Sequence, residues 1–331
     1  MVRVGINGFG RIGRMFFRSS LEIDGLEVVA INDITSVSLL AHLLKYDSIH
    51  GRLNHSVSVD EDHIVVDGSR IKVFSHRNPA EIPWHELDVD VVVEASGIFR
   101  ERQSASLHLG NGVEYVFVSA PMPDPDIMIL PYLNEDKFDA RNHRVISMGS
   151  CTTNALAPLI KVLEDKFGIV SGQMTTIHAY TNDQRLLDSV HKDFRRARAA
   201  AVNIVPTSTG AAKAIFQIYP HLKGRLNAIA VRVPVSDGSL VDLNVYLEKD
   251  VTKEEVNESF KEASETYLKE SLLYVDEPIV SSDIIGLPYL SIFDSLLTSV
   301  SGGNMVKVVA WYDNEYGYAY HLAKLIARLL G

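Results

Sequence analysis

The stretch VRVGINGFGRIG (residues 2–13) sets the architecture of the first half of the chain. Residues 2–7 are largely apolar with several β-branched side chains, which is typical of a strand buried on both faces of a parallel sheet. Gly8, Gly10 and Gly13 follow in the spacing G-x-G-x-x-G and open a segment with the pattern of a helix. A strand, a glycine-rich turn and a helix in this order predict the nucleotide-binding edge of a doubly wound sheet.

An acidic residue further along supports the same interpretation. Asp33 lies 20 residues beyond Gly13, at the end of the next predicted strand. In such a unit Gly8 permits a tight turn, Gly10 lets the backbone approach a pyrophosphate, and Gly13 brings the helix against the strand. The Asp33 carboxylate can accept hydrogen bonds from ribose hydroxyls and repels a 2′-phosphate. We therefore expect NAD, and not NADP, as the cofactor.

The two halves of the chain have different patterns. The first alternates strands and helices, which predicts an α/β domain with a doubly wound parallel (Rossmann) sheet. In the second half the strand-like segments alternate apolar and polar residues, which predicts an α+β catalytic domain whose mixed or antiparallel sheet has helices on one face. Thr252 and Glu255 form a capping box at the start of one of these helices. The further strands expected are residues 26–32, 89–96, 113–120, 174–181, 227–235 and 239–249.

The division between the halves is not expected to be a single cut. Four prolines in residues 121–131 indicate a connection that separates them. The last helix presents Leu322, Leu325 and Ile326 on one face, so we expect it to pack back onto the first domain. The expected domains are residues 1–149 plus 315–331 for the NAD-binding domain and residues 150–314 for the catalytic domain.

The bulk composition limits the classes of function. The chain has 331 residues, of which 46% are hydrophobic and 22% charged, ordinary values for a globular protein with room for two cores. No apolar run has membrane-spanning length, a strand follows the first methionine directly, and one cysteine cannot form an intrachain disulfide. We therefore expect a cytoplasmic protein that does not enter a membrane. A formal net charge of -10 argues against a requirement for nucleic acid, and anionic ligands must be met by locally concentrated arginine.

The single cysteine, Cys151, lies in the run SCTTN at the start of a predicted helix. Two interpretations stand at this point: a helix cap with a bystander thiol, or a reactive thiol. His178, on a predicted strand, is a candidate base, because a helix start and an imidazole together favour the thiolate. Arg195, Arg196 and Arg198 precede the segment TSTG and could form a solvated face or a phosphate site. In a chain of net charge -10, the phosphate site is favoured.

Seven motifs, in order along the chain, resemble those of phosphorylating glyceraldehyde-3-phosphate dehydrogenases. The resemblance implies NAD-dependent oxidation of D-glyceraldehyde 3-phosphate to 1,3-bisphosphoglycerate, a reaction of glycolysis, by a homotetramer. It implies that Cys151 adds to the aldehyde to give a thiohemiacetal and then a thioester, that His178 is the base, and that no metal takes part. The motifs are INGFGRIGR, LLKYDSIHG, SCTTN, the loop from TND to RRARAAA, TSTGAAKA, AVRVP and WYDNEYGY.

The resemblance also implies the binding residues, position by position. The loop of residues 180–203 is similar to a segment that crosses the core of the tetramer. Which of Arg195, Arg196 and Arg198 contacts phosphate is left open. The residues implied for NAD are Gly8, Gly10, Arg11, Ile12, Asp33, Arg77, Ser119, Asn314 and Tyr318. Those implied for the attacking phosphate are Ser150, Thr152, Arg196, Thr209 and Gly210, and those for the phosphate of the substrate are Thr181 and Arg232.

The chain departs from the family pattern at a few positions. Ala155 stands where many relatives have a second cysteine, and residues 119–136 lack the usual lysine and the usual Gly-Val-Asn. Ser189 and Val190 are nearer to NADP-tolerant relatives than the Leu-Pro of many NAD-specific ones. Because Asp33 acts directly on the 2′ position, NAD remains the expected cofactor with some NADP tolerance left open.

Two other functions are possible for a chain with this pattern. Erythrose-4-phosphate dehydrogenase is the nearest, but those relatives depart from TGAAKA, whereas Thr209, Gly210 and Lys213 are intact here. A catalytically silent binding protein with the same fold is the rival from a different class. The presence of Cys151, His178 and both arginine and hydroxyl clusters argues against it.

Overall fold

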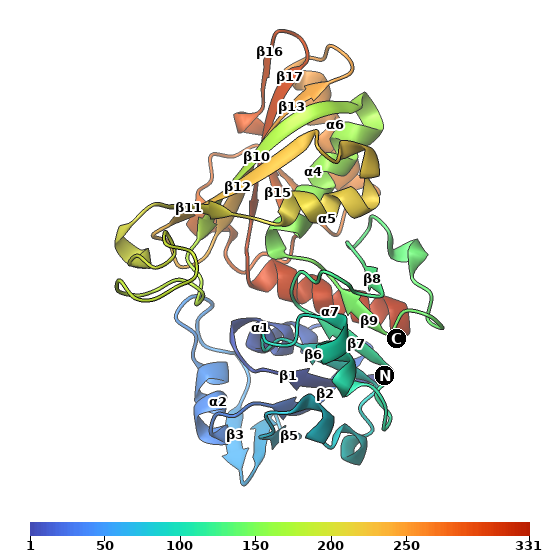
Figure 1. Cartoon of the computed structure of the whole chain (residues 1–331), viewed down its shortest axis with the longest axis vertical. Helices are drawn as coiled ribbons and strands as arrows, with labels where there is room; N and C mark the ends of the chain where they lie inside the picture. Colours follow the sequence, from blue (N-terminus) through green and yellow to red (C-terminus); the bar gives the residue numbers. More distant parts are fainter. The chain divides into compact units, whose positions relative to one another are not determined.

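The computed structural model describes residues 1–331, and the chain forms two compact units. The first unit is Met1–Gly149 with Ala319–Gly331, and the second is Ser150–Tyr318. The chain thus leaves the first unit once and returns to it through the last helix, α7 (Tyr316–Leu330), drawn in red in Figure 1. None of the helices combines the length and the hydrophobicity that crossing a membrane requires.

A nine-stranded sheet forms the first unit, in the order β3-β4-β5-β2-β1-β6-β7-β9-β8. From β5 to β8 all neighbouring strands are parallel, whereas β3, β4 and β5 are joined antiparallel at one edge. The direction of winding switches between β1 and β6, and ligands of such sheets bind outside the carboxyl ends of the strands at that point. The strands are β1 (Val2–Asn7), β2 (Leu26–Asn32), β3 (Val57–Asp60), β4 (His63–Val66), β5 (Ser69–Phe74), β6 (Val91–Glu94), β7 (Tyr115–Val118), β8 (Ile127–Met128) and β9 (Val145–Ser147).

The glycine-rich turn joins β1 to α1 (Arg11–Ser20), as the sequence predicts. Gly8 has a φ of +90°, and a Cβ there would lie 2.5 Å from the backbone N and Cα of Ser96. A Cβ at Gly13 would lie 2.2 Å from the carbonyl oxygen of Gly8. Both positions therefore require glycine. The other helices of this unit are α2 (Val37–Lys45), α3 (Arg102–Ala105), and the short 3-10 turns η1 (Pro79–Glu81), η2 (Trp84–Leu87), η3 (Ser106–His108) and η4 (Glu135–Lys137).

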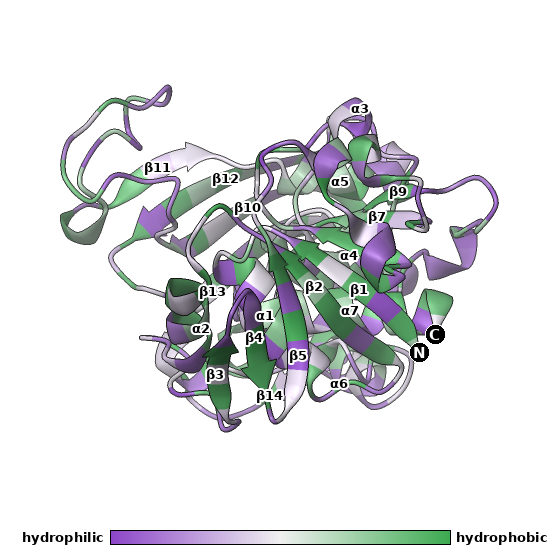
Figure 2. Cartoon of the chain, turned by 90° about the horizontal axis from the view of Figure 1, so that it is seen from below, coloured by the Kyte–Doolittle hydropathy of each residue, from purple (hydrophilic) through white to green (hydrophobic).

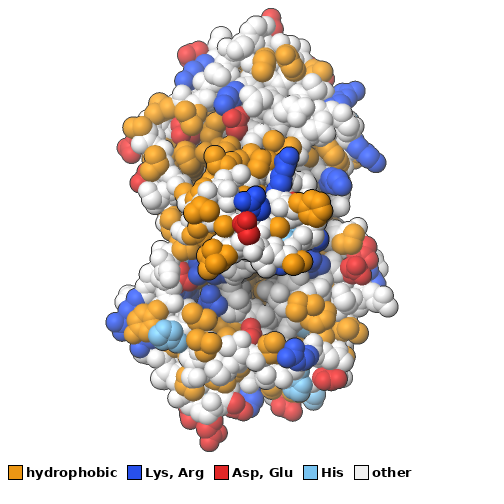
Figure 3. Space-filling model, turned by 60° about the vertical axis from the view of Figure 1, so that its left-hand side comes forward, with side chains coloured by type: hydrophobic (Ala, Val, Ile, Leu, Met, Phe, Trp, Pro, Cys, Tyr) orange, Lys and Arg blue, Asp and Glu red, His pale blue; other side chains and the backbone are white.

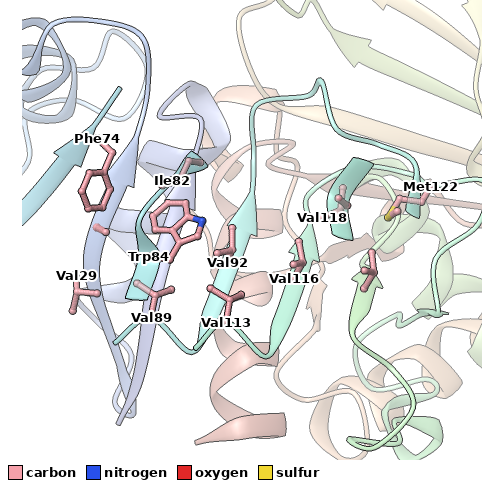
Figure 4. Close-up of a cluster of buried hydrophobic side chains, with 13 residues drawn as sticks. Val29, Phe74, Ile82, Trp84, Val89, Val92, Val113, Val116, Val118 and Met122 are labelled. Carbon is pink, nitrogen blue, oxygen red and sulfur yellow. The ribbon is translucent and has the colours of Figure 1, made fainter. Parts of the chain in front are cut away.

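The hydrophobic core of this unit includes side chains of the sheet together with Ile82 and with Trp84 of η2. Figure 4 shows Trp84 beside Phe74, with ring centroids 6.0 Å apart and planes at 84°, and valines of β6 and β7 alongside. A Cβ at Gly5 would come 2.7 Å from the Trp84 ring, so the absence of a side chain on β1 makes room for the indole. In Figure 2 β1 and β2 are mainly green, as expected for strands buried on both faces.

A mixed eight-stranded sheet forms the second unit, in the order β11-β12-β10-β13-β17-β15-β14 with β16 paired to β17. The pairs β10–β12 and β14–β15 are parallel and the others are antiparallel, in agreement with the predicted mixed sheet. The strands are β10 (Ile169–Ala179), β11 (Val205–Ser208), β12 (Leu226–Val233), β13 (Ser239–Leu247), β14 (Leu272–Val275), β15 (Ser291–Asp294), β16 (Ser299–Ser301) and β17 (Met305–Tyr312).

Helices cover one face of this second sheet, as Figure 1 shows for α4 (Cys151–Phe167), α5 (Ala211–Ile218) and α6 (Lys253–Glu265). The predicted capping box at α6 is present: Thr252 Oγ1 accepts from Glu255 N–H at 3.2 Å, and the Glu255 carboxylate accepts from Thr252 N–H at 2.7 Å. Other side chains of the sheet, among them Ile229, Tyr246 and Met305, are exposed. Short 3-10 turns connect the elements at η5 (Ala200–Val202), η6 (Pro220–Leu222), η7 (Ser281–Ile284) and η8 (Ser295–Leu297).

The proline-containing segment does not separate the two halves, so that expectation was wrong. Within it, β8 pairs with β9, and the first unit continues to Gly149. The reason lies in polar side chains: Asp126 accepts from the N–H groups of Arg144 and Val145, at 2.9 and 2.8 Å. The strands expected at 89–96 and 113–120 are also shorter than predicted, since β6 begins at Val91 and β7 at Tyr115.

Candidate active site

Cys151 is the first residue of α4, as the sequence predicts. Ser150 is the N-cap, and its Oγ accepts from Thr153 N–H at 3.1 Å. The polar run SCTTN is therefore a helix start, and it places the sulfur beside the first-turn N–H groups of a 17-residue helix. Such a helix end carries partial positive charge and favours an anionic sulfur.

His178 lies near the end of β10 and faces the cysteine. Its Nε2 is 3.6 Å from Cys151 Sγ, so the structure brings the two predicted catalytic side chains together. The imidazole is buried and packs edge-on against Tyr312, with ring centroids 5.9 Å apart and planes at 79°. The Nδ1 atom lies 2.7 Å from the carbonyl oxygen of Ala179. When Nδ1 donates to that carbonyl, Nε2 has a free lone pair directed at the thiol, as a general base requires.

Arg232 lies on β12, opposite His178 in the register of the sheet. Its guanidinium is 2.8 Å from His178 Nδ1 and donates to the Ala179 carbonyl at 2.9 Å. Nδ1 cannot donate to Ala179 and accept from Arg232 at once, so the two contacts belong to different tautomers. With a protonated imidazole, Arg232 keeps the carbonyl as its acceptor. The cation predicted for a substrate phosphate thus lies directly beside the catalytic pair.

Burial opposes a lone charge on either member of the pair. It raises the pKa of the Cys151 thiol, while the Arg232 charge and hydrogen bonds from Thr152 act in the opposite direction. Burial also lowers the pKa of His178 to about 3, and the charge of Arg232 adds to that effect. Moving the thiol proton to Nε2 creates two opposite charges 3.6 Å apart, which attract each other. The geometry therefore supports transfer of the thiol proton to His178, which ionises the two side chains as a pair. That Cys151 is a thiolate in the resting protein remains a prediction.

A buried hydroxyl network lies beneath the pair, and the sequence reasoning did not identify it. Tyr312 Oη is 2.9 Å from Thr152 Oγ1 and 2.8 Å from Thr176 Oγ1. Thr152, predicted as a phosphate ligand, thus has its hydroxyl engaged with the last residue of β17. The only signal in the sequence was the motif WYDNEYGY, which contains Tyr312 but does not show which side chain it meets.

Arg196 belongs to a cluster of charges in the loop between β10 and β11. Its Nε donates to Thr207 Oγ1 at 3.0 Å, and another nitrogen is paired with Asp183. Burial acts to raise the pKa of Asp183, but the Arg196 guanidinium outweighs it and holds the pKa below its usual value. Arg198 pairs with Asp188 in the same way, at 2.7 Å. Two of the three arginines, Arg196 and Arg198, therefore form ion pairs within this loop.

Arg196 also lies next to the TSTG segment. A guanidinium nitrogen is 3.3 Å from the Ser208 carbonyl oxygen, one residue before Thr209. Thr209 Oγ1 accepts from Ala211 N–H at 3.2 Å, and Gly210 is the N-cap of α5 without a side-chain cap. Three of the residues predicted for the attacking phosphate, Arg196, Thr209 and Gly210, thus lie in one region of the second unit. Thr181, predicted for the other phosphate, lies just beyond β10, where its carbonyl accepts from Gln184 N–H at 2.9 Å.

The cofactor residues predicted in the first unit lie at the carboxyl edge of its sheet. Asp33 accepts from Phe9 N–H at 2.8 Å and from Thr35 N–H at 3.0 Å, which holds its carboxylate beside the glycine turn. Arg11 pairs with Asp47 and holds the pKa of that carboxyl down to about 2 against the effect of burial. Arg77 is exposed, beyond the end of β5. Ser119 follows β7, and its N–H donates to the carbonyl of Glu94 at 3.0 Å.

The remaining two cofactor candidates belong to the second unit. Asn314 follows β17 and is buried, with its Oδ1 accepting from Ser239 Oγ at 2.6 Å. Tyr318 is buried in α7, and burial raises the pKa of its phenol, with the Cys151 charge as a second cause. Tyr318 therefore lies within electrostatic range of the candidate nucleophile.

Comparisons with known proteins cover both units of the chain. The chain matches the glyceraldehyde 3-phosphate dehydrogenase NAD binding domain over residues 2–102 and the C-terminal domain of the same family over residues 150–314. It is 56% identical to glyceraldehyde-3-phosphate dehydrogenase 2 of Streptomyces avermitilis over 325 residues, which cover 98% of this chain and 97% of that relative. It is 55% identical to glyceraldehyde-3-phosphate dehydrogenase 1 of Bacillus cereus over 327 residues, 99% and 98% of the two chains. For the dehydrogenase of Geobacillus stearothermophilus the identity is 54% over 326 residues, 98% and 97% of the two chains.

Proposed function

The chain belongs to the glyceraldehyde-3-phosphate dehydrogenase family, and on that premise we propose how its residues carry out the reaction. It is an NAD-dependent oxidoreductase that acts on the aldehyde of D-glyceraldehyde 3-phosphate, a step of glycolysis. The observation that carries the assignment of catalytic residues is the 3.6 Å separation of Cys151 Sγ and His178 Nε2 at the start of α4.

In the proposed reaction the sulfur of Cys151 attacks the aldehyde carbon while its proton passes to Nε2 of His178. The N–H of Cys151, at the helix start, and the protonated imidazole stabilise the developing oxyanion, which takes the proton back to give a thiohemiacetal. His178 then removes the hydroxyl proton of the thiohemiacetal, and the Ala179 carbonyl holds the ring through Nδ1. NAD, when bound, accepts the hydride from the same carbon, which leaves a thioester on Cys151.

Phosphate completes the reaction by attacking the thioester carbon, with the sulfur of Cys151 as the leaving group. A thioester suits this step because it retains the free energy of oxidation and remains a good electrophile. We assign the attacking phosphate to Arg196, Thr209 and Gly210 with Ser150 and Thr152, and the phosphate of the substrate to Thr181 and Arg232. What supports the first assignment is the position of Arg196 beside the TSTG segment, where its guanidinium contacts Thr207 and Ser208.

The first unit fits a dinucleotide. The N-cap Gly10 of α1 provides no side-chain cap, and a Cβ at that position would have no neighbouring atom within 4 Å. The space beside Gly10 at the start of α1 is therefore open, and we propose that the pyrophosphate lies there against the first turn of the helix. The residues we assign to NAD are Gly8, Gly10, Arg11, Ile12, Asp33, Arg77 and Ser119 of this unit, with Asn314 and Tyr318 of the other.

We also propose that the protein is a homotetramer. The loop that follows β10 exposes large apolar side chains, each 69% to 89% accessible, which is unusual for a surface that stays in water. Figure 3 faces this side and shows hydrophobic side chains gathered over the loop region of the second unit. Burial of these groups against another copy of the chain accounts for them. They are Leu186, Leu187, Val190, Phe194, Val202 and Ile204.

The compartment is proposed to be the cytoplasm. A single cysteine that serves as the nucleophile has to remain reduced, and a reducing compartment provides that condition.

A steady-state assay tests the proposed function. NADH formation is measured with glyceraldehyde 3-phosphate and with erythrose 4-phosphate, each with and without inorganic phosphate. We expect phosphate-dependent NADH formation from the three-carbon aldehyde and little from the four-carbon sugar. Phosphate-independent turnover of erythrose 4-phosphate would point to the rival dehydrogenase. NAD binding without turnover of either aldehyde would point to a binding protein.

A further inference from the structure

A chain of buried polar side chains crosses the carboxyl ends of the three central strands of the first sheet. The last residues of β2, β1 and β6 are Asn32, Asn7 and Glu94, and they are neighbours in the register of the sheet. Asn32 Nδ2 donates to Asn7 Oδ1 at 2.8 Å, and Asn7 Nδ2 donates to Glu94 Oε2 at 2.5 Å. All three side chains are buried. Adjacent strand ends are thus joined by side chains as well as by the backbone.

Glu94 is the acceptor on which this chain of hydrogen bonds converges. Trp84 Nε1–H donates to His108 Nδ1 at 3.2 Å, so the imidazole has its proton on Nε2 and donates it to Glu94 Oε2 at 3.1 Å. The other oxygen, Oε1, accepts from Ser96 N–H at 2.8 Å and from the Ser96 hydroxyl. Together with Asn7, these are four donors to one carboxylate and no cation. Such a buried charge is tolerated only because every acceptor position is used.

The same chain of hydrogen bonds reaches three loops at the edge of the sheet. Asn7 immediately precedes Gly8, the first residue of the glycine turn. Asn32 Oδ1 accepts from His76 N–H at 2.8 Å, and its Nδ2 donates to the His76 carbonyl at 2.9 Å, one residue before Arg77. The hydroxyl of Ser96 accepts from Ile98 N–H at 3.1 Å.

Two of these loops also touch each other. Gly8 lies so close to the backbone of Ser96 that a Cβ on the glycine would be 2.5 Å from it. Loops at the carboxyl ends of the strands, on either side of the switch between β1 and β6, are those that surround a dinucleotide in this class of sheet. A small change in the Ser96 turn would therefore displace the glycine turn as well.

We propose that Glu94 is a positioning residue for NAD, which fixes the glycine turn and the Ser96–Ile98 turn in one geometry through its four hydrogen bonds. The proposal rests on the NAD-binding function of this unit and gives Glu94 no contact with the cofactor. A carboxylate is needed because it can only accept. A glutamine of the same shape would direct its NH₂ group at donors, either those of Ser96 or those of Asn7 and His108.

The test compares isosteric variants by NAD affinity and not by turnover alone. For Glu94→Gln in the full chain, we expect the Kd of NAD, measured by calorimetry, to rise about tenfold or more. The rate at which iodoacetamide alkylates Cys151 without NAD should stay within about twofold of the unmodified protein, because the second unit is unchanged. Glu94→Asp, which keeps the charge but is one methylene shorter, should give an intermediate Kd, and it serves if Glu94→Gln does not fold.

Two controls separate positioning from general stability. Asp294 is a buried carboxylate of the second unit that accepts from Trp311 Nε1–H at 3.1 Å and from Leu296 N–H at 3.2 Å. Asp294→Asn should lower the Tm as Glu94→Gln does, yet leave the Kd of NAD unchanged. Trp84→Phe removes the far donor of the chain together with part of a buried ring, so it should lower the Tm with at most about a threefold rise in Kd. An unchanged Kd in Glu94→Gln, or a Kd that simply follows the Tm in all variants, would overturn the proposal.

Discussion

The two units use buried polar side chains for opposite purposes. At the carboxyl edge of the first sheet, Asn7 and Glu94 hydrogen-bond to their neighbours in the sheet and so hold the loops above them. In the second unit Cys151, His178 and Arg232 face one another, and burial opposes the charge that each must carry or share. A network in which every buried polar group is hydrogen-bonded holds a binding edge in one geometry. A site in which burial opposes the charges of its side chains shifts their pKa values and so favours reactivity. The comparison predicts that binding and chemistry can be changed separately.

The sharpest test of that separation is Cys151→Ser. A serine hydroxyl is far less acidic than a thiol and forms no thioester, so dehydrogenase activity should fall by more than about a thousandfold. The Kd of NAD should stay within about twofold, because the residues of the first unit are untouched. Steady-state rates and calorimetry on the same preparation measure both quantities. Retention of full activity would mean that the nucleophile has been assigned wrongly.

The corresponding change on the binding side is Asp33→Ala. The carboxylate accepts from Phe9 and Thr35 N–H groups and is held where it would repel a 2′-phosphate. Its removal should shift the ratio of kcat/KM for NAD over NADP toward NADP by about 10- to 100-fold, while the alkylation rate of Cys151 stays the same. Glu27→Gln, on the strand β2 that precedes Asp33 and paired with Arg3 at the surface, is the matched control. If the ratio is unmoved, Asp33 does not select the cofactor.

A smaller effect is expected within the reacting centre from Arg232→Ala. Burial raises the pKa of the Cys151 thiol and the Arg232 charge counteracts it, so loss of the cation should raise that pKa further. Because only the thiolate reacts, the midpoint of the alkylation rate against pH should move to higher pH, and the rate at neutral pH should fall severalfold. Arg225→Ala, at an exposed position just before β12, is the control. A midpoint that moves to lower pH would contradict the sign of the Arg232 interaction.

The same contrast explains which parts of the molecule could be predicted from the sequence. The predicted limits of β1 and β2 are confirmed to the residue, because strands buried on both faces are apolar runs bounded by polar or glycine residues. The pairing of Cys151 with His178 was also predicted, because a reactive thiol at a helix start needs a base on another element. The strand limits depend on local patterns that a single segment carries, whereas the pairing follows from the chemistry of the two side chains.

Other features depend on residues that only the fold brings together. Trp84 on η2, Glu94 at the end of β6 and His108 on η3 meet only in the folded unit, and no spacing in the sequence marks them as a set. The hydroxyl pair of Thr152 and Tyr312 likewise joins a helix start to a strand end 160 residues away. Neither network could be found from periodicity or from a motif, because the partners lie on different elements of the chain.

The smallest predicted effect concerns Tyr132, in the segment whose structure the sequence reasoning misjudged. This residue has a φ of +66°, a conformation that favours glycine, and it lies in the segment that lacks the family's usual Gly-Val-Asn. Its ring lies 4.2 Å from the guanidinium of Arg328 on α7, which also bonds to the Tyr132 hydroxyl and pairs with Glu135. The backbone strain in the first unit is thus offset by contacts with the returning helix.

Two substitutions separate the backbone strain at Tyr132 from the contacts that its side chain makes with Arg328. Tyr132→Phe keeps the ring and loses the hydroxyl bond, so the free energy of unfolding should fall by about 1 kcal/mol. Tyr132→Gly relieves about 1–2 kcal/mol of strain but loses both the ring and the bond, so its stability should lie within about 1 kcal/mol of the unmodified protein. Urea unfolding followed by circular dichroism measures both. If Tyr132→Gly raised the free energy of unfolding by the full strain of about 1–2 kcal/mol, the contacts between Tyr132 and Arg328 would contribute nothing to stability. The apolar face of α7 alone would then anchor that helix to the first unit.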